Sequence, residues 1–95
     1  MPAGAPDQTF AQDITITNRR GLHARASAMF VRTAERYDAA ITVTRDGTTV
    51  GGTSIMGLLM LAAGPGASVR VKVTGRQARE ALDAIVALIE SGFGE

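Results

Sequence analysis

The segment NRRGLHARAS, residues 18–27, contains the single histidine of the chain, His23, with arginines on both sides of it. A neutral imidazole can attack a phosphoryl group, and the guanidinium of Arg25 has the forked donors that match phosphate oxygens. No second acid or base is close in sequence, which favours transfer of a phosphoryl group over its hydrolysis. These residues therefore indicate a phospho-acceptor, His23, with Arg25 as its phosphate contact. We interpret Gly21 as leaving room for a bulky partner.

A strand and a helix must position these side chains. In DITIT, residues 13–17, Ile14 and Ile16 alternate with polar residues, which predicts a half-buried strand. From Leu22 to Tyr37 apolar residues recur three or four apart, which predicts a helix whose first turn contains His23. The first N–H groups of a helix lack internal partners and carry the positive end of its dipole. The position of His23 therefore suits an anion such as a phosphoryl group.

The remaining patterns predict a hairpin, two more helices and a last strand. Asp46-Gly47 lies between β-branched residues and predicts a two-residue turn. The apolar run of residues 55–63 follows Thr53-Ser54, either of which can cap a helix, and the glycines of residues 64–66 are expected to end it. Alternating valines predict a strand in SVRVKVTG, residues 68–75, and an apolar stripe predicts a helix from about Gln77.

The predicted order of elements is therefore βαββαβα. This order indicates an α+β two-layer open-faced sandwich, in which three helices cover one face of a four-stranded antiparallel sheet. We expect a loose N-terminal tail over residues 1–8 and a single domain over residues 9–95.

Composition narrows the class of function. The 95 residues include 10 basic and 9 acidic side chains, 4% aromatic residues and no cysteine. A nucleic-acid-binding module is disfavoured because it needs stacking side chains and a basic surface, and thiol catalysis is excluded. The first residues do not resemble a secretory signal, and the longest apolar run is far shorter than the roughly 20 residues that cross a bilayer. We expect a monomeric, cytoplasmic protein without membrane insertion, metal or cofactor.

The residues alone leave three other interpretations open, two of them purely structural and one of a different function. His23 can be an ordinary surface or capping residue. Asn18, Arg19, Arg20 and Arg25 can form the phosphate cradle of an acylphosphatase-like hydrolase, in which the histidine is incidental. Ser54 can be an N-cap with no other role.

Two motifs give the chain a resemblance to a known family. GLHAR, residues 21–25, and TSIMGLLML, residues 53–61, with the predicted order of elements, resemble HPr, the histidine-containing phosphocarrier family of the phosphoenolpyruvate phosphotransferase system. The resemblance implies that enzyme I phosphorylates His23 on Nδ1, that Arg25 accompanies the phosphoryl group, and that enzyme IIA-type proteins receive it. It also implies that Ser54 is the serine modified by HPr kinase/phosphorylase where that enzyme exists. The implied partner-docking residues are Leu22, Ile55, Met56, Leu59 and Met60.

One position departs from the family pattern. Most members have proline after the arginine, where this chain has Ala26. Proline is preorganised for the first helical turn, whereas alanine is a good helix former and keeps one more N–H donor for an anion. We expect the site to survive the change, which resembles a nitrogen-related or regulatory phosphorelay more than sugar uptake.

Overall fold

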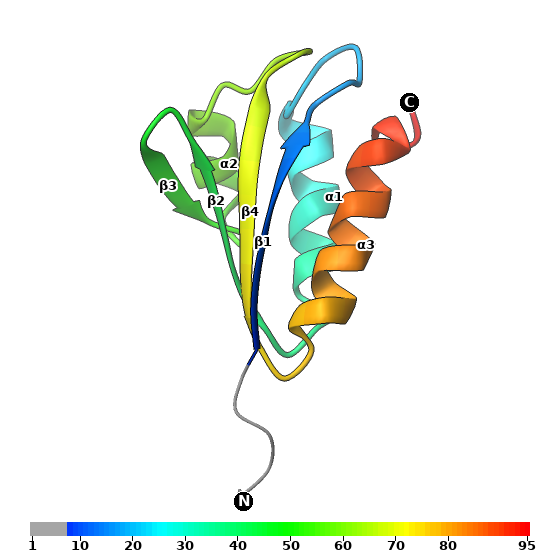
Figure 1. Cartoon of the computed structure of the whole chain (residues 1–95). Helices are drawn as coiled ribbons and strands as arrows, with labels where there is room; N and C mark the ends of the chain where they lie inside the picture. Colours follow the sequence, from blue (N-terminus) through cyan, green and yellow to red (C-terminus); the bar gives the residue numbers. More distant parts are fainter. Residues whose placement is uncertain (1–7) are drawn as a thin grey trace, which may run out of the picture.

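The computed structural model describes residues 8–95, and its elements follow the predicted order (Figure 1). The strands are β1 (Gln8–Thr15), β2 (Ala40–Arg45), β3 (Thr48–Gly51) and β4 (Ser68–Gly75). The helices are α1 (Ala24–Ala34), α2 (Ile55–Met60) and α3 (Ala78–Glu90), followed by one turn of 3-10 helix, η1 (Gly92–Gly94). β1 begins at Gln8, within the segment predicted as a tail, and the rest of that segment lies outside the described residues.

The four strands form one antiparallel sheet in the order β1-β4-β2-β3. β4 lies inside the sheet, where Val71 pairs with Gln12 of β1 on one side and with Val43 of β2 on the other. Along β4 buried valines alternate with exposed Arg70 and Lys72, as a period-two pattern requires. Figure 1 shows α1 and α3 side by side along one face of this sheet. The two-layer open-faced sandwich is therefore confirmed.

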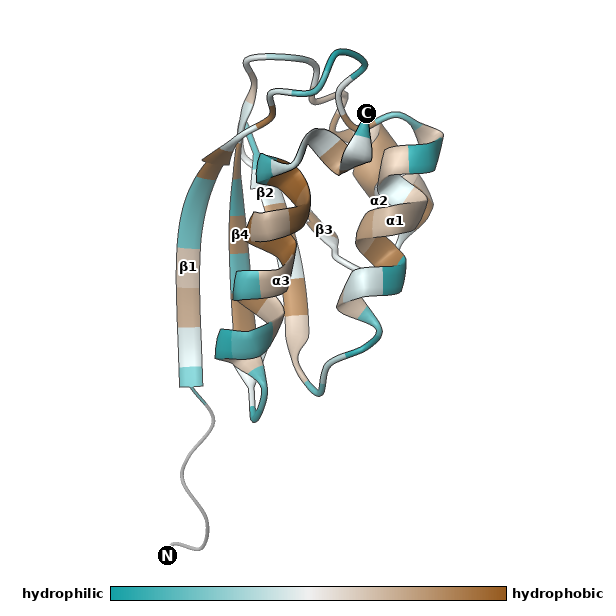
Figure 2. Cartoon of the chain, turned by 90° about the vertical axis from the view of Figure 1, so that its right-hand side faces the viewer, coloured by the Kyte–Doolittle hydropathy of each residue, from teal (hydrophilic) through white to brown (hydrophobic). Residues whose placement is uncertain are grey.

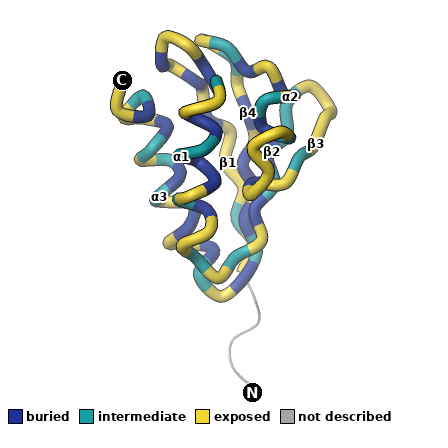
Figure 3. Tube along the Cα trace, turned by 180° about the vertical axis from the view of Figure 1, so that it is seen from behind, coloured by how far each residue is buried: buried dark blue, intermediate teal, exposed yellow. Residues whose placement is uncertain are grey.

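The core lies between the sheet and the helices (Figures 2 and 3). The apolar stripe of α1 is buried where its spacing predicts, at Ala26, Phe30 and Ala34. Burial of Leu22 just before the helix and of Ala26 in its first turn anchors the chain on both sides of His23. The other large fully buried side chains include Ile16, Leu58, Ile85 and Ile89. Within residues 8–95, no helix is both long and apolar enough to cross a membrane.

The hairpin between β2 and β3 turns where the sequence predicts. Asp46 and Gly47 have φ values of 49° and 82°, both in the left-handed region. An Asp-Gly pair tolerates two positive φ angles in succession, and this geometry matches the twist of the strands. The turn lets β3 pair antiparallel with β2, and α2 follows β3 after residues 52–54.

α2 ends earlier than the sequence predicts. The helix stops at Met60, and Ala62 already has a φ of 51°, before the glycines that were expected to end the helix. The next residue, Ala63, is buried, and its carbonyl accepts a hydrogen bond from the Leu22 N–H at 2.9 Å. The residues just after α2 therefore contact the loop before α1 instead of continuing the helix.

Candidate phospho-acceptor site

The loop before α1 holds His23 at the start of the helix. Leu22 is buried, and its backbone is tied to Ala63. His23 is the N-cap of α1 with an extended backbone (φ −73°, ψ 178°), and its carbonyl accepts the N–H of Ser27 at 2.8 Å. The side chain of His23 is 16% exposed, so the imidazole lies at the rim of the core and still reaches the surface.

Gly21 is required by packing within the chain. Its φ is +65°, and a Cβ at this position would lie 2.3 Å from the carbonyl oxygen of Ala63. Any other residue would therefore be strained and would push the Ala63 turn away. The interpretation of Gly21 as room for a partner is wrong, because the chain itself fills that space.

A carboxylate orients the ring of His23. Nε2 of His23 lies 2.5 Å from Oε2 of Glu95, whose side chain is 30% exposed. A carboxylate accepts hydrogen bonds, so we assign the ring proton to Nε2 and the lone pair of the neutral imidazole to Nδ1. Among residues 8–95, no group forms a hydrogen bond with Nδ1. Nδ1 is therefore the ring nitrogen that is available for chemistry.

Glu95 is the site residue that the sequence did not reveal. It is 72 positions from His23, and the turn η1 after α3, with Phe93 buried, brings it to the site. The hydrogen bond with His23 lowers the pKa of Glu95, and the hydrogen bond with Asn18 and the positive charge of Arg20 act in the same direction, against partial desolvation. Sequence patterns could not indicate this carboxylate, because it is far from His23 along the chain. The expectation that no acid lies near His23 therefore holds in the sequence but not in space.

The buried side chain of Asn18 forms hydrogen bonds that stabilise the loop before α1. It is 5% exposed, and its amide nitrogen donates to the carbonyl of Gly21 at 2.8 Å and to Oε2 of Glu95 at 3.3 Å. Within residues 8–95 its oxygen Oδ1 has no hydrogen-bond partner. The donors of Asn18 are therefore committed to the loop and to Glu95, which argues against Asn18 as part of an acylphosphatase-like cradle.

The first turn of α1 offers donors to an anion. The N–H groups of Ala24, Arg25 and Ala26 have no acceptor among residues 8–95, and no acidic residue lies in this turn. The Arg25 side chain is exposed and forms no ion pair within the described part of the chain. Ala26 is fully buried in the first turn of α1, which begins at Ala24. The structure thus places His23 beside Arg25 and a set of N–H donors.

Ser54 caps the second helix. It is the N-cap of α2, and its Oγ accepts the N–H of Gly57 at 2.9 Å. Of the two hydroxyl residues that were candidates for this cap, Ser54 is the one used. The side chain is exposed, so a structural role as a cap and access to a modifying enzyme are compatible.

The predicted docking residues divide into exposed and buried ones. Ile55, Met56 and Met60 are 40%, 67% and 75% exposed, and Leu59 is half-buried. These four residues, which we call the α2 patch, lie on a helix that packs against α1. Leu22 is 5% exposed and belongs to the core, so its side chain is not available for docking and the prediction for Leu22 is corrected.

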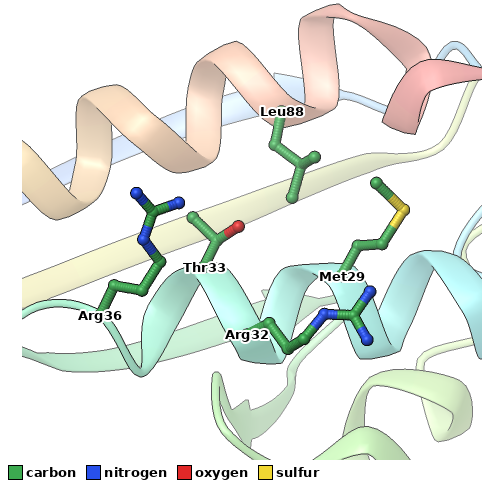
Figure 4. A pocket seen from close by; sticks show the side chains of 5 residues that line it. All are labelled: Met29, Arg32, Thr33, Arg36 and Leu88. Carbon is green, nitrogen blue, oxygen red and sulfur yellow. The ribbon is translucent and has the colours of Figure 1, made fainter.

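Surface hollows lie beside these elements. One of about 490 Å³ is lined by Thr17, Asn18, Arg19, Glu90, Ser91, Gly92 and Glu95. A groove of about 290 Å³ between α1 and α3 is lined by Met29, Arg32, Thr33, Arg36 and Leu88 (Figure 4). His23 lines neither hollow. Glu95, the hydrogen-bond partner of His23, lines the larger of the two hollows.

The chain matches known proteins over most of its length. Residues 10–91 match the family model of the PTS HPr component phosphorylation site. Phosphocarrier protein HPr of Cupriavidus necator is 45% identical over 84 residues, which are 88% of this chain and 94% of that protein. Phosphocarrier protein NPr of Escherichia coli is 39% identical over 88 residues, 92% of this chain and 98% of that protein. The crystal structure of HPr-C-His from Thermoanaerobacter tengcongensis, 42% identical, superposes with a TM-score of 0.87 and covers 90% of this chain and 97% of that one. The chain belongs to the HPr family, the phosphocarrier proteins of the phosphotransferase system.

Proposed function

We propose that this phosphocarrier accepts a phosphoryl group from phosphorylated enzyme I on Nδ1 of His23 and passes it to an enzyme IIA-type acceptor. The observation that carries the proposal is the geometry of the ring. Glu95 engages Nε2, which leaves Nδ1 as the free nitrogen at the start of α1, where N–H groups lack acceptors within residues 8–95. Membership of the HPr family supports the same carrier role.

The transfer is a single displacement at phosphorus. The Nδ1 lone pair attacks, a P–N bond forms, and the bond from phosphorus to the donor breaks with its electron pair leaving on the donor. The ring keeps its proton on Nε2 and becomes positively charged, and the adjacent Glu95 carboxylate offsets that charge. The phosphoryl oxygens receive hydrogen bonds from Arg25 and from the first N–H groups of α1. Transfer to the acceptor reverses the step and restores the neutral imidazole.

Docking on donor and acceptor uses the α2 patch. Met56 and Met60 are the most exposed large apolar side chains of the described residues. A partner protein that covers them removes apolar surface from water, which favours binding. Methionine is flexible and polarisable, so one patch adapts to two different partner surfaces. Packing of α2 against α1 puts this patch on the element next to His23 and Arg25.

Phosphorylation of Ser54 by an HPr kinase/phosphorylase is the regulation that we propose for this patch. A phosphate at this position adds about −1.5 to −2 charges at the start of α2, where a helix tolerates negative charge. The same charge lies next to Ile55 and Met56 and repels an acidic partner surface. Phospho-Ser54 is therefore expected to weaken docking without unfolding the domain.

We further propose three general properties of the protein. They are the monomeric state, the cytoplasmic location, and the nitrogen-related or regulatory branch that Ala26 indicates.

The test is labelling by enzyme I with phosphoenolpyruvate that carries a labelled phosphoryl group. The wild-type protein should acquire label that is lost in acid and kept in alkali, as a phosphohistidine requires, and His23→Ala should acquire none. Ser54→Ala is the matched control and should be labelled as the wild type is. Absence of label on the wild type with an active enzyme I, or turnover of acetyl phosphate by His23→Ala, would refute the carrier proposal in favour of a hydrolase.

A further inference from the structure

A side chain from the sheet holds the end of α2. Nη1 of Arg45, the last residue of β2, donates to the carbonyl of Leu61 at 2.9 Å and to that of Ala62 at 3.4 Å. Leu61 is the C-cap of α2, and the last carbonyls of a helix lack internal partners. α2 has no basic residue in its own last turn, so Arg45 supplies from β2 the cation that favours a helix C-terminus.

The turn that Arg45 holds is unfavourable by itself. Ala62 has a φ of 51°, in the left-handed region that an alanine avoids. The carbonyl of Leu61 belongs to the peptide group before Ala62, and the carbonyl of Ala62 belongs to the one after it. Arg45 therefore contacts the peptide groups on both sides of the strained residue, where it can stabilise their orientation.

The same turn contacts the loop that carries the phospho-acceptor. Ala63, the next residue, accepts the N–H of Leu22 at 2.9 Å, and its carbonyl lies against Gly21 so closely that a Cβ there would clash. His23 directly follows Leu22. Residues 61–63 therefore join the end of the docking helix to the His23 loop, and Arg45 is the side chain that holds this junction.

We propose that Arg45 is a positioning residue for phosphoryl transfer, which keeps the α2 patch in register with the His23 loop through residues 61–63. The inference rests on the proposed phosphocarrier function. Asp46 competes weakly for the guanidinium, because its Oδ2 is 3.9 Å from Nη2 and its side chain is 85% exposed. None of the hydrogen bonds within residues 8–95 joins Arg45 to His23 or Glu95. Loss of Arg45 should therefore affect docking more than the chemical step.

Three variants distinguish the effect of the Arg45 hydrogen bonds from the effect of its positive charge. Arg45→Met removes the hydrogen bonds and keeps an apolar stem, whereas Arg45→Lys keeps the charge and loses the fork. Arg70→Met is the matched control: it removes the same charge from an exposed ion pair with Asp13, 3.1 Å apart, on β4 and β1. Two quantities are measured for each variant: KM and kcat for phosphorylation by enzyme I, and the hydrogen-exchange rate of the Leu22 amide.

Arg45→Met should raise KM about tenfold with kcat unchanged, since hydrogen bonds from a charged group are lost. It should also speed exchange of the Leu22 amide, whose acceptor belongs to the turn that Arg45 holds. Arg45→Lys should have a KM and a Leu22 exchange rate between those of the wild type and those of Arg45→Met. Arg70→Met should match the wild type in both quantities.

Two outcomes overturn the inference. One is an unchanged KM and unchanged Leu22 exchange in Arg45→Met, even with a lower unfolding temperature, because Arg45 would then have a structural role alone. The other is a raised KM without faster Leu22 exchange, because Arg45 would then act by touching the partner. A wild-type protein that enzyme I does not label refutes the carrier function instead, and the exchange rates still decide whether Arg45 holds the His23 loop.

Discussion

The starts of α1 and α2 use the N-cap side chain in opposite ways. At α2, Ser54 turns its Oγ back to the helix and accepts the N–H of Gly57, three residues on, at 2.9 Å. At α1, His23 makes no side-chain cap and directs its ring to Glu95. The N–H of Ala26, three residues on from His23, therefore has no acceptor within residues 8–95.

This difference separates a helix start that is complete from one that is open to a ligand. A capped start has satisfied one of its free N–H groups internally and gains stability from it. An uncapped start keeps its donors for an anion that arrives later, and the phosphoryl group on His23 would be that anion. The start of α1 thus has free donors, whereas a phosphate on Ser54 would replace an existing cap.

The largest effect is expected from removal of the cation at the open start. Arg25→Met should lower kcat for phosphorylation of His23 by about tenfold to a hundredfold, because charge-assisted hydrogen bonds to the phosphoryl oxygens are lost. Arg76→Met is the control, since Arg76 is exposed and its contact with Asp38 is long, at 3.9 Å. Rapid-quench kinetics with labelled enzyme I gives both rates. Equal losses in the two variants would mean that overall charge, and not the start of α1, accounts for the effect.

The next largest effect is expected from a substitution in the α2 patch, on the capped helix. Met56→Glu should raise KM for enzyme I about tenfold, because it puts a charge where apolar contact forms, which is worth about 1.5–3 kcal/mol for a buried methionine. Its free energy of unfolding should stay near that of the wild type, as the side chain is 67% exposed. Met56→Leu keeps the apolar surface and should keep the KM. A loss of stability as large as the loss of transfer would place Met56 in the core instead.

A smaller effect is expected from the cap itself. Ser54→Ala should lower the free energy of unfolding by about 1 kcal/mol, because the Gly57 N–H loses its acceptor. Ser54→Asp restores an acceptor and should recover that stability, while its negative charge slows transfer from enzyme I. Urea unfolding and labelling rates measure the two properties. If enzyme I phosphorylated Ser54→Asp as fast as the wild type, negative charge at this helix start would not regulate docking.

The smallest effect is expected from the pH dependence of Glu95. Its pKa is lowered below the ordinary value of 4.5 in the folded protein, chiefly by the hydrogen bond with His23. A carboxyl group with a lowered folded-state pKa contributes stability above its unfolded pKa and loses it as the pH falls through the folded one. Between about pH 5 and about pH 3 the wild type should therefore lose more unfolding free energy than Glu95→Gln. Parallel pH profiles of the two proteins would show that the contact does not persist in solution.

Much of the fold was predictable because it depends on local patterns. The alternation in Ile14, Ile16 and the valines of β4, the stripe of α1, and the Asp46-Gly47 turn each indicate one element without reference to the others. The position of His23 and Arg25 at the start of a helix was predictable for the same reason, since the apolar stripe that begins at Leu22 indicates where α1 starts.

Other features depended on contacts between distant segments. The steric need for Gly21 and the hydrogen bond from the Leu22 N–H both come from the contact with Ala63, just after the end of α2. No local pattern indicates such a contact, because hydropathy reports how apolar a segment is and not which segment it meets.

The sequence by itself determined the order of elements and the position of His23 and Arg25 at the start of a helix, because periodicity and neighbouring residue types act over a few positions. Only the tertiary structure decided which ring nitrogen of His23 is free, because the carboxylate of Glu95 reaches Nε2 from 72 residues away. It likewise decided that Arg45 closes the end of α2, since a hydrogen bond depends on distance in space and direction, and neither is encoded in spacing along the chain.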